Sequence, residues 1–203
     1  QPPTRKEVKT MEIKDYHLDF EPLAERMYTN SIILHHSASE DAAAPDIHRW
    51  HRDIGYSGIG YHFVIRKYGT IESGRPLNKI GAHAGSEANY DSIGICLAGN
   101  FMITEPQPEQ IASLYKLINH LEEYYGKVLK VFRHCDVSAT LCPGKNFPWP
   151  LPGLSEEADW KQILIDRALE EKLITEEHDP DDIADKWFVL AVSLNLIDRI
   201  LEL

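Results

Sequence analysis

The spacing of hydrophobic residues predicts a core of alternating strands and helices between residues 30 and 133. Apolar runs of strand length occupy residues 31–36 and 92–98, and such short runs are typical of buried strands. Alternating apolar and polar positions around the turn at 68–70 predict a hairpin of strands 60–67 and 70–73. A short strand is also expected at 127–133.

Two helices are predicted between these strands. Residues 46–52 follow Pro45, and proline is favoured at the first position of a helix. A longer helix is expected at 108–125, since its apolar residues recur at intervals of three and four. These residues are Ile111, Leu114, Leu117, Ile118 and Leu121. Residues 134–154 are rich in Pro and Gly and are predicted to be a loop that carries function.

The C-terminal region has a helical pattern of its own. Apolar residues recur at helical spacing in two segments separated by Asp179-Pro180, which predicts a helical hairpin. The apolar positions are Trp160, Ile163, Leu164 and Ala168, then Ile183, Trp187, Leu190, Leu194, Ile197 and Leu201. We therefore expect an N-terminal extension (1–29), a catalytic domain (30–154) and a helical appendage (155–203).

Charge is distributed unevenly along the 203 residues. The net charge of −11 falls mostly in residues 156–203, which hold 5 basic and 14 acidic side chains. The rest of the chain has no basic stripe for phosphates, so we expect no nucleic-acid partner. No segment approaches the roughly 20 apolar residues of a membrane span. The first 15 residues lack the apolar core of a secretory signal.

Several histidines and cysteines stand at predicted strand ends or in loops, where side chains can meet at one site. The three cysteines, Cys96, Cys135 and Cys142, are too few for a four-cysteine metal site. Two imidazoles with one thiolate form a recognised catalytic zinc set that leaves a position open. Because neighbouring strand residues point to opposite faces, only one of His35 and His36 should reach the metal. The alternation does not say which one.

The chain resembles the type 2 N-acetylmuramoyl-L-alanine amidases, a family that includes phage lysozyme-like amidases and peptidoglycan recognition proteins. The resemblance runs from about residue 30 to 150 and rests on six motifs in order. They are LHHSAS at 34–39, GIGYHFVI at 58–65, GTIESGRP at 69–76, GAHAG at 81–85, SIGICLAGNF at 92–101 and RHCDVSATLCPG at 133–144.

The resemblance implies an α/β fold with a mixed central β-sheet flanked by helices, and zinc at the floor of an open groove. It assigns the metal ligands to His35, His134 and Cys142. It also assigns catalytic roles to Tyr61, which would orient or deprotonate the attacking water, and to Thr140, which would stabilise the oxyanion.

The stretch around the GAHAG motif resembles the groove wall of the family, which implies substrate binding by His83, Ala84 and Asn89. The implied substrate is peptidoglycan or its muropeptides, cut between muramic acid and L-alanine. We therefore expect a wall-acting enzyme, extracellular or released by a phage. The C-terminal helices should dock on the body of this chain, on a second copy or on the cell wall.

Two other functions compete with the zinc amidase. A peptidoglycan recognition module would bind without cutting, as relatives do when a metal ligand is lost. A cysteine hydrolase would use Cys142 or Cys135 with a histidine base. Chelator sensitivity separates that enzyme from a zinc hydrolase.

Overall fold

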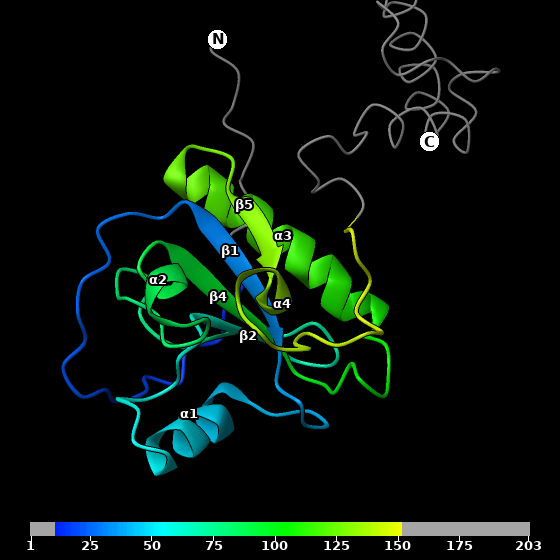
Figure 1. Ribbon diagram of the computed structural model, residues 1–203, viewed down its shortest axis with the longest axis horizontal. Coiled ribbons are helices and arrows are strands. Elements are labelled where there is room, and N and C mark those ends of the chain that lie inside the picture. The colour runs from blue at the N-terminus through cyan, green and yellow to red at the C-terminus, as the bar shows by residue number, and fades with distance from the viewer. Residues whose placement is uncertain (1–10, 152–203) are drawn as a thin grey trace, which may run out of the picture. The chain divides into compact units, whose positions relative to one another are not determined.

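A computed structural model describes residues 11–151 of the protein. Within them, a five-stranded sheet has the order β3-β2-β4-β1-β5 (Figure 1). Its strands are β1 (Ser31–His36), β2 (Phe63–Ile65), β3 (Ile71–Ser73), β4 (Ser92–Leu97) and β5 (Lys130–Arg133). Strands β2, β4, β1 and β5 pair in parallel, and β3 pairs antiparallel to β2. The predicted mixed α/β fold is confirmed.

The two helices predicted between the strands are present, and two further short helices were not expected. Helix α1 spans Ala44–Asp53 and α3 spans Pro108–Tyr125. The unexpected helices are α2 (Ser86–Asn89) and α4 (His134–Val137). Each is a single turn, too short for a hydrophobic period to appear in the sequence. The prediction that 134–154 is all loop was therefore wrong at its first four residues.

Strand alternation divides the central sheet into two faces. Cys96 of β4 lies beside His35 of β1 in register, and paired residues of neighbouring strands share a face. The face that carries His35 and Cys96, called the front face here, also carries Ile33. The other face, the back face, carries Ile32 and Leu34.

Helix α3 covers the back face. Its buried side chains Leu114, Leu117, Ile118 and Leu121 are at most 1% exposed, and they recur at the spacing of one helical stripe. At the start of the helix, the buried Gln110 amide donates to the carbonyls of Ile65 and Ala98. The helix ends at Gly126, whose φ of 64° is the left-handed conformation that glycine readily adopts. The back face is therefore a closed apolar core.

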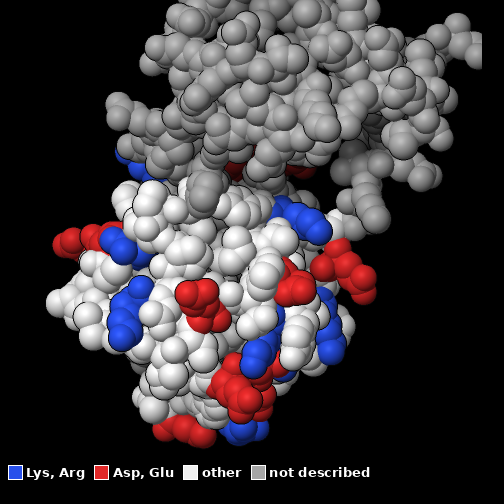
Figure 2. All heavy atoms as spheres, turned by 90° about the vertical axis from the view of Figure 1, so that its right-hand side faces the viewer, with Lys and Arg blue, Asp and Glu red and all other residues white. Residues whose placement is uncertain are grey.

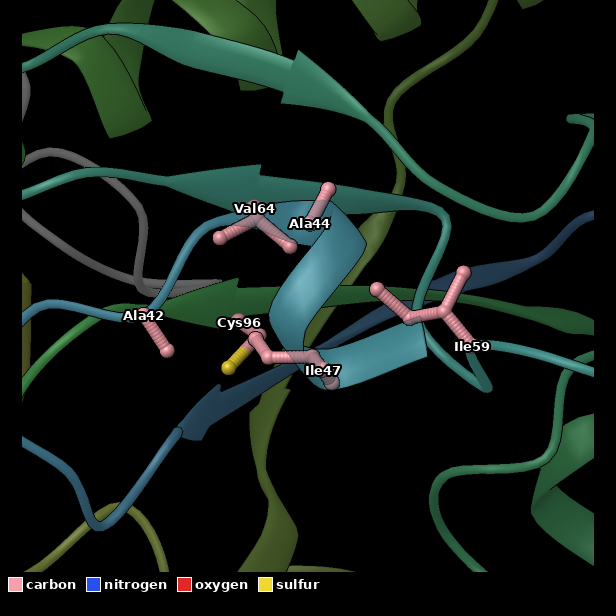
Figure 3. Close-up of a cluster of buried hydrophobic side chains, with 6 residues drawn as sticks. All are labelled: Ala42, Ala44, Ile47, Ile59, Val64 and Cys96. Carbon is pink, nitrogen blue, oxygen red and sulfur yellow. The ribbon is translucent and has the colours of Figure 1, made fainter. Parts of the chain in front are cut away.

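Helix α1 packs over one end of the front face. The buried residues that join it to the sheet are small or β-branched, and they are drawn in Figure 3. They are Ala42, Ala44, Ile47, Ile59, Val64 and Cys96. This cluster holds α1 against the sheet. Cys96 of the cluster is paired in register with His35 of β1, so the histidine lies on the same face.

A buried carboxylate fixes the start of α1. Glu72 of β3 is 1% exposed and accepts a hydrogen bond of 2.7 Å from the backbone N–H of Ala44. Its other oxygen accepts from the Tyr16 hydroxyl at 3.1 Å and from the Arg66 guanidinium at 3.2 Å. A negative charge at a helix N-terminus is favourable because the first N–H groups lack partners.

The described part of the predicted N-terminal extension, residues 11–29, packs against the domain. Lys14 exchanges backbone hydrogen bonds with Ile71 and Ser73 at the sheet edge, and Tyr16, Leu18 and Phe20 pack on the α1 cluster. The predicted C-terminal hairpin lies outside the described residues. None of the helices in residues 11–151 is long and apolar enough to cross a membrane.

Candidate active site

Three potential metal ligands converge at the end of β1. His35 lies near the end of that strand, His134 opens α4 directly after β5, and Cys142 follows in the next loop. One ligand atom from each residue lies within 4.8 Å of the other two. The His35 and His134 rings are 4.4 Å apart between centroids. The parallel pairing of β1 with β5 produces this convergence, because both strands end at the same edge of the sheet.

The donor set suits a zinc ion. Nδ1 of His35 and Sγ of Cys142 are 3.8 Å apart. Zinc–nitrogen and zinc–sulfur bonds of about 2.1 and 2.3 Å place two tetrahedral ligands about 3.6 Å apart, so the spacing fits. Two imidazoles and one thiolate also leave one tetrahedral position open, as catalytic zinc sites require.

Burial keeps these ligands uncharged before a metal binds. It lowers the pKa of His35 well below the usual value, with repulsion from His134 and His36 added, and it lowers the pKa of His134. Burial also raises the pKa of the Cys142 thiol to about 11, against a hydrogen bond from the His36 N–H that lowers it. Metal binding here therefore releases a proton from the thiol.

Tyr61 borders the metal-ligand cluster. Its ring centroid lies 5.0 Å from that of His35 and 5.5 Å from that of His51. Burial raises its pKa well above the usual value, with nearby Cys96 and Cys142 adding to the effect. A phenol of this kind keeps its proton at neutral pH and can donate a hydrogen bond.

Thr140 lies in the loop between His134 and Cys142. Its Oγ1 accepts a hydrogen bond of 3.2 Å from the Cys142 N–H, which leaves the hydroxyl proton available for another acceptor. The loop is closed by a 2.9 Å bond from the Cys135 N–H to the Cys142 carbonyl. This contact brings the two ends of the loop, and with them His134 and Cys142, close together.

The three residues predicted to bind substrate occupy different depths. His83 is 9% exposed, and its Nδ1 lies 3.0 Å from Nε2 of His35. Ala84 is buried. The side-chain oxygen of Asn89 accepts from the N–H groups of His83 and Ala84, both at 2.9 Å. His83 thus lies behind the metal-ligand cluster, and Asn89 holds the loop that carries it.

A groove of about 570 Å³ lies over the front face, and its lining does not include His35, His134 or Cys142. Its floor includes Ile33, two residues before His35, and its walls come from the loop and helix at 84–88 and from α4. The lining residues are Asn30, Ser31, Ile33, Ala84, Gly85, Glu87, Ala88, Asp91, Lys130, Phe132, Val137 and Ser138. Ser138 also donates to the Ala84 carbonyl at 3.1 Å, joining the two walls.

Two histidines next to predicted site residues lie elsewhere. Nδ1 of His36 accepts from the Phe101 N–H at 3.1 Å, so this ring points away from the metal-ligand cluster. His62 accepts from the Gly94 N–H at Nδ1 and donates from Nε2 to the Lys79 carbonyl, at 3.0 and 2.9 Å. Both nitrogens of His62 are therefore satisfied by backbone groups.

Sequence reasoning missed three supporting contacts of the site. The backbone N–H of His36 donates to the Cys142 sulfur at 3.4 Å, Cys96 lies against Tyr61, and His83 contacts His35. The first contact is made by the backbone N–H of residue 36, which any residue except proline would supply, so the amino-acid sequence does not indicate it. The LHH and GAHAG motifs contained the third pair, but they did not indicate that the two histidines touch.

The fold and the site together define the class shared by peptidoglycan amidases and peptidoglycan recognition proteins. Residues 25–145 match the family described as N-acetylmuramoyl-L-alanine amidase, and the chain belongs to that family. The endolysin of Enterobacteria phage T3 is 36% identical over 129 residues, covering 58% of this chain and 82% of the phage protein. The endolysin of Escherichia phage T7 is 35% identical over 130 residues, covering 59% and 83%.

Solved structures agree with this assignment. The N-acetylmuramoyl-L-alanine amidase LysC from Clostridium intestinale is 39% identical, with a TM-score of 0.65 over 68% of this chain and 93% of that chain. A single-residue mutant of the Drosophila peptidoglycan recognition protein PGRP-LB, solved in complex with tracheal cytotoxin, is 26% identical. Its TM-score is 0.59 over 66% of this chain and 89% of that chain.

Proposed function

We propose that this protein hydrolyses the amide bond between N-acetylmuramic acid and L-alanine in peptidoglycan, with a zinc ion held by His35, His134 and Cys142. The observation that carries the proposal is the convergence of these three donors within 4.8 Å of one another in a chain of the amidase family. No other residue type is needed to complete the protein's share of an open zinc site.

When bound, zinc would polarise the amide carbonyl and lower the pKa of water at the site towards about 7. The chain's own residues do the rest. Tyr61 orients the attacking water through its phenolic oxygen, beside His35. Thr140 donates its hydroxyl proton towards the carbonyl oxygen as negative charge develops there, while its oxygen is held by the Cys142 N–H. A preorganised donor of this kind stabilises the transition state more than the ground state.

The groove supports a glycopeptide substrate. Its lining combines apolar side chains such as Phe132 and Val137 with polar ones such as Asn30 and Ser138, as a muropeptide with sugar and peptide parts requires. Ala84 contributes directly to this wall, and Asn89 acts through the backbone it holds. On the face seen in Figure 2, Lys and Arg side chains are interspersed with Asp and Glu, without the single-sign patch expected of a nucleic-acid site.

The relatives favour action on the cell wall, because several of the similar proteins are phage endolysins. We propose an extracellular or phage-released enzyme. We further propose that the catalytic domain ends near residue 154 and that 155–203 docks on this chain, on a second copy or on the wall.

Cys142 lies near His35, and such a pair could also serve as a nucleophile and base. That reading predicts full activity in a chelator. A recognition module that only binds would give no product at all, with or without zinc.

The test uses purified peptidoglycan and the full chain. Mass analysis of the products should give free stem peptides that begin with L-alanine and glycans that keep the lactyl group. A chelator should abolish their release, and added zinc should restore it. Products cut at a glycosidic bond, or hydrolysis that a chelator leaves intact, would contradict the proposal.

A further inference from the structure

The two ring nitrogens of His35 face different partners. Nδ1 points to the Cys142 sulfur at 3.8 Å and Nε2 to Nδ1 of His83 at 3.0 Å. A neutral imidazole carries one proton, and it binds a metal through the nitrogen without it. If His35 binds through Nδ1, its proton must be on Nε2, and Nδ1 of His83 must accept it.

The His83 ring is held rigidly in the position of that acceptor. A side-chain carbon on Gly81 would lie 2.5 Å from the His83 ring, and one on Gly94 would lie equally close. The ring therefore fills a slot that only glycines at both positions leave open. Asn89 fixes the same loop from its backbone side through the N–H groups of His83 and Ala84.

The hydrogen bonding of His83 differs from that of an ordinary buried histidine. His62, 5.8 Å away between ring centroids, has backbone partners on both nitrogens. His83 has His35 on Nδ1, and its buried Nε2 has no hydrogen-bond partner among the described residues. A buried polar atom without a partner is unusual and costs stability. The contact with His35 explains why the His83 ring occupies this buried position.

We propose that His83 is a positioning residue that accepts the Nε2 proton of His35 and so fixes the tautomer and ring orientation that present Nδ1 to the metal. The inference rests on the proposed zinc site. Metal-bound histidines commonly donate their second N–H to a carboxylate, a backbone carbonyl or water. A neutral imidazole in that position adds no negative charge, so the metal keeps the positive charge that one thiolate leaves.

The first test needs no substitution and no metal. Long-range proton–nitrogen NMR correlations on the metal-free full chain report which nitrogen of each histidine carries its proton. We expect the proton on Nε2 in both His35 and His83. A proton on Nδ1 of His35, or an even mixture of its tautomers, would overturn the inference.

The second test measures zinc affinity by competition with a chromophoric chelator. His83→Leu removes the acceptor and should weaken zinc binding about 10–100-fold, the usual loss for such partners. His83→Asn places an amide oxygen near the position of Nδ1 and should restore most of the affinity. His62→Gln is the control at similar depth and should bind zinc as the wild type does.

The outcomes separate this inference from the proposed function. A wild-type chain that binds no zinc contradicts the zinc site itself. Zinc binding by the wild type with equal affinity in His83→Leu contradicts only the role of His83, as does an Asn variant that binds as poorly as the Leu variant. Thermal unfolding of each variant reports its fold, and if His83→Leu does not fold, the tautomers of the wild type decide.

Discussion

The two faces of the central sheet are built from the same strands but for different purposes. On the back face, α3 seals Ile32 and Leu34 under a stripe of leucine and isoleucine, and the buried amide of Gln110 is held by two backbone carbonyls. The front face carries Ile33, which lines the groove, and His35, which is one of the three candidate metal ligands. One face should therefore set the stability of the domain, and the other should set its chemistry.

The largest expected effect is on the front face. Cys142→Ser replaces a thiolate with a neutral hydroxyl, which is a poor zinc ligand. Zinc affinity should fall more than about 100-fold. Removing a residue that only hydrogen-bonds to a metal ligand already lowers metal affinity about 10–100-fold. Hydrolysis should fall to background while the melting temperature without metal stays near that of the wild type. Retained zinc, measured by elemental analysis, would remove Cys142 from the ligand set.

The matching change on the back face should have the opposite profile. Leu117→Ala leaves a cavity under α3 and should lower the free energy of unfolding by about 2–5 kcal/mol. Chemical denaturation measures this loss. Zinc affinity per folded molecule should not change. A variant that loses zinc affinity and keeps its stability would mean that the two faces are not separate in this way.

Within the front face, Tyr61→Phe removes one oxygen next to the ligands. Turnover should fall about 10²–10³-fold, the range for losing one preorganised donor, while zinc binding and stability persist. Thr140→Val should cost less, because zinc shares the stabilisation of the same oxygen. Initial rates on a purified muropeptide check both variants. Unchanged turnover in Tyr61→Phe would leave that residue a structural role only.

The smallest predicted effect is a pH dependence from His62. Its pKa falls from the usual 6.5 to about 3, chiefly because of burial. The unfolded chain therefore binds a proton between these values that the folded chain does not, and the stability contributed by neutral His62 is lost as the pH falls below 6.5. The slope from this residue is at most about 1.4 kcal/mol per pH unit.

His62→Gln should reduce the acid sensitivity by up to that slope, because glutamine does not titrate in this range. Denaturation in chelator at several pH values between neutral and acidic conditions measures the difference. Equal slopes for the two proteins would show that another group takes up the proton. His35 and His83, also buried with lowered pKa values, stay in both chains.

The helix that covers the back face could be predicted from the sequence almost residue by residue. The period of Leu114, Leu117, Ile118 and Leu121 gives α3 its face, and Pro108 and Gly126 mark its ends. The front face could not be predicted in this way. Alternation allowed either His35 or His36 to reach the metal, and only the family motif selected His35.

The remaining front-face details depend on loops. Helices α2 and α4 are single turns, and the segments that carry them are joined by long-range contacts such as the bond from Ser138 to the Ala84 carbonyl. The depth of His83 depends on Gly81 and on Gly94, which lies much further along the chain, because their missing side chains leave room for the ring. Such contacts join distant segments, and no local pattern encodes them.

The Glu72 contacts have a consequence for the mobility of helix α1. The first amide of α1 is bonded to a strand of the hairpin rather than to a neighbour in its own helix, and the same carboxylate holds Tyr16 of the N-terminal segment. Amide hydrogens at the start of a helix commonly exchange with solvent by fraying. Here the Ala44 amide can exchange only when the hairpin contact is broken. Helix α1, the hairpin and the N-terminal segment are thereby joined in one cooperative unit, so the start of α1 cannot loosen without breaking its contact to β3.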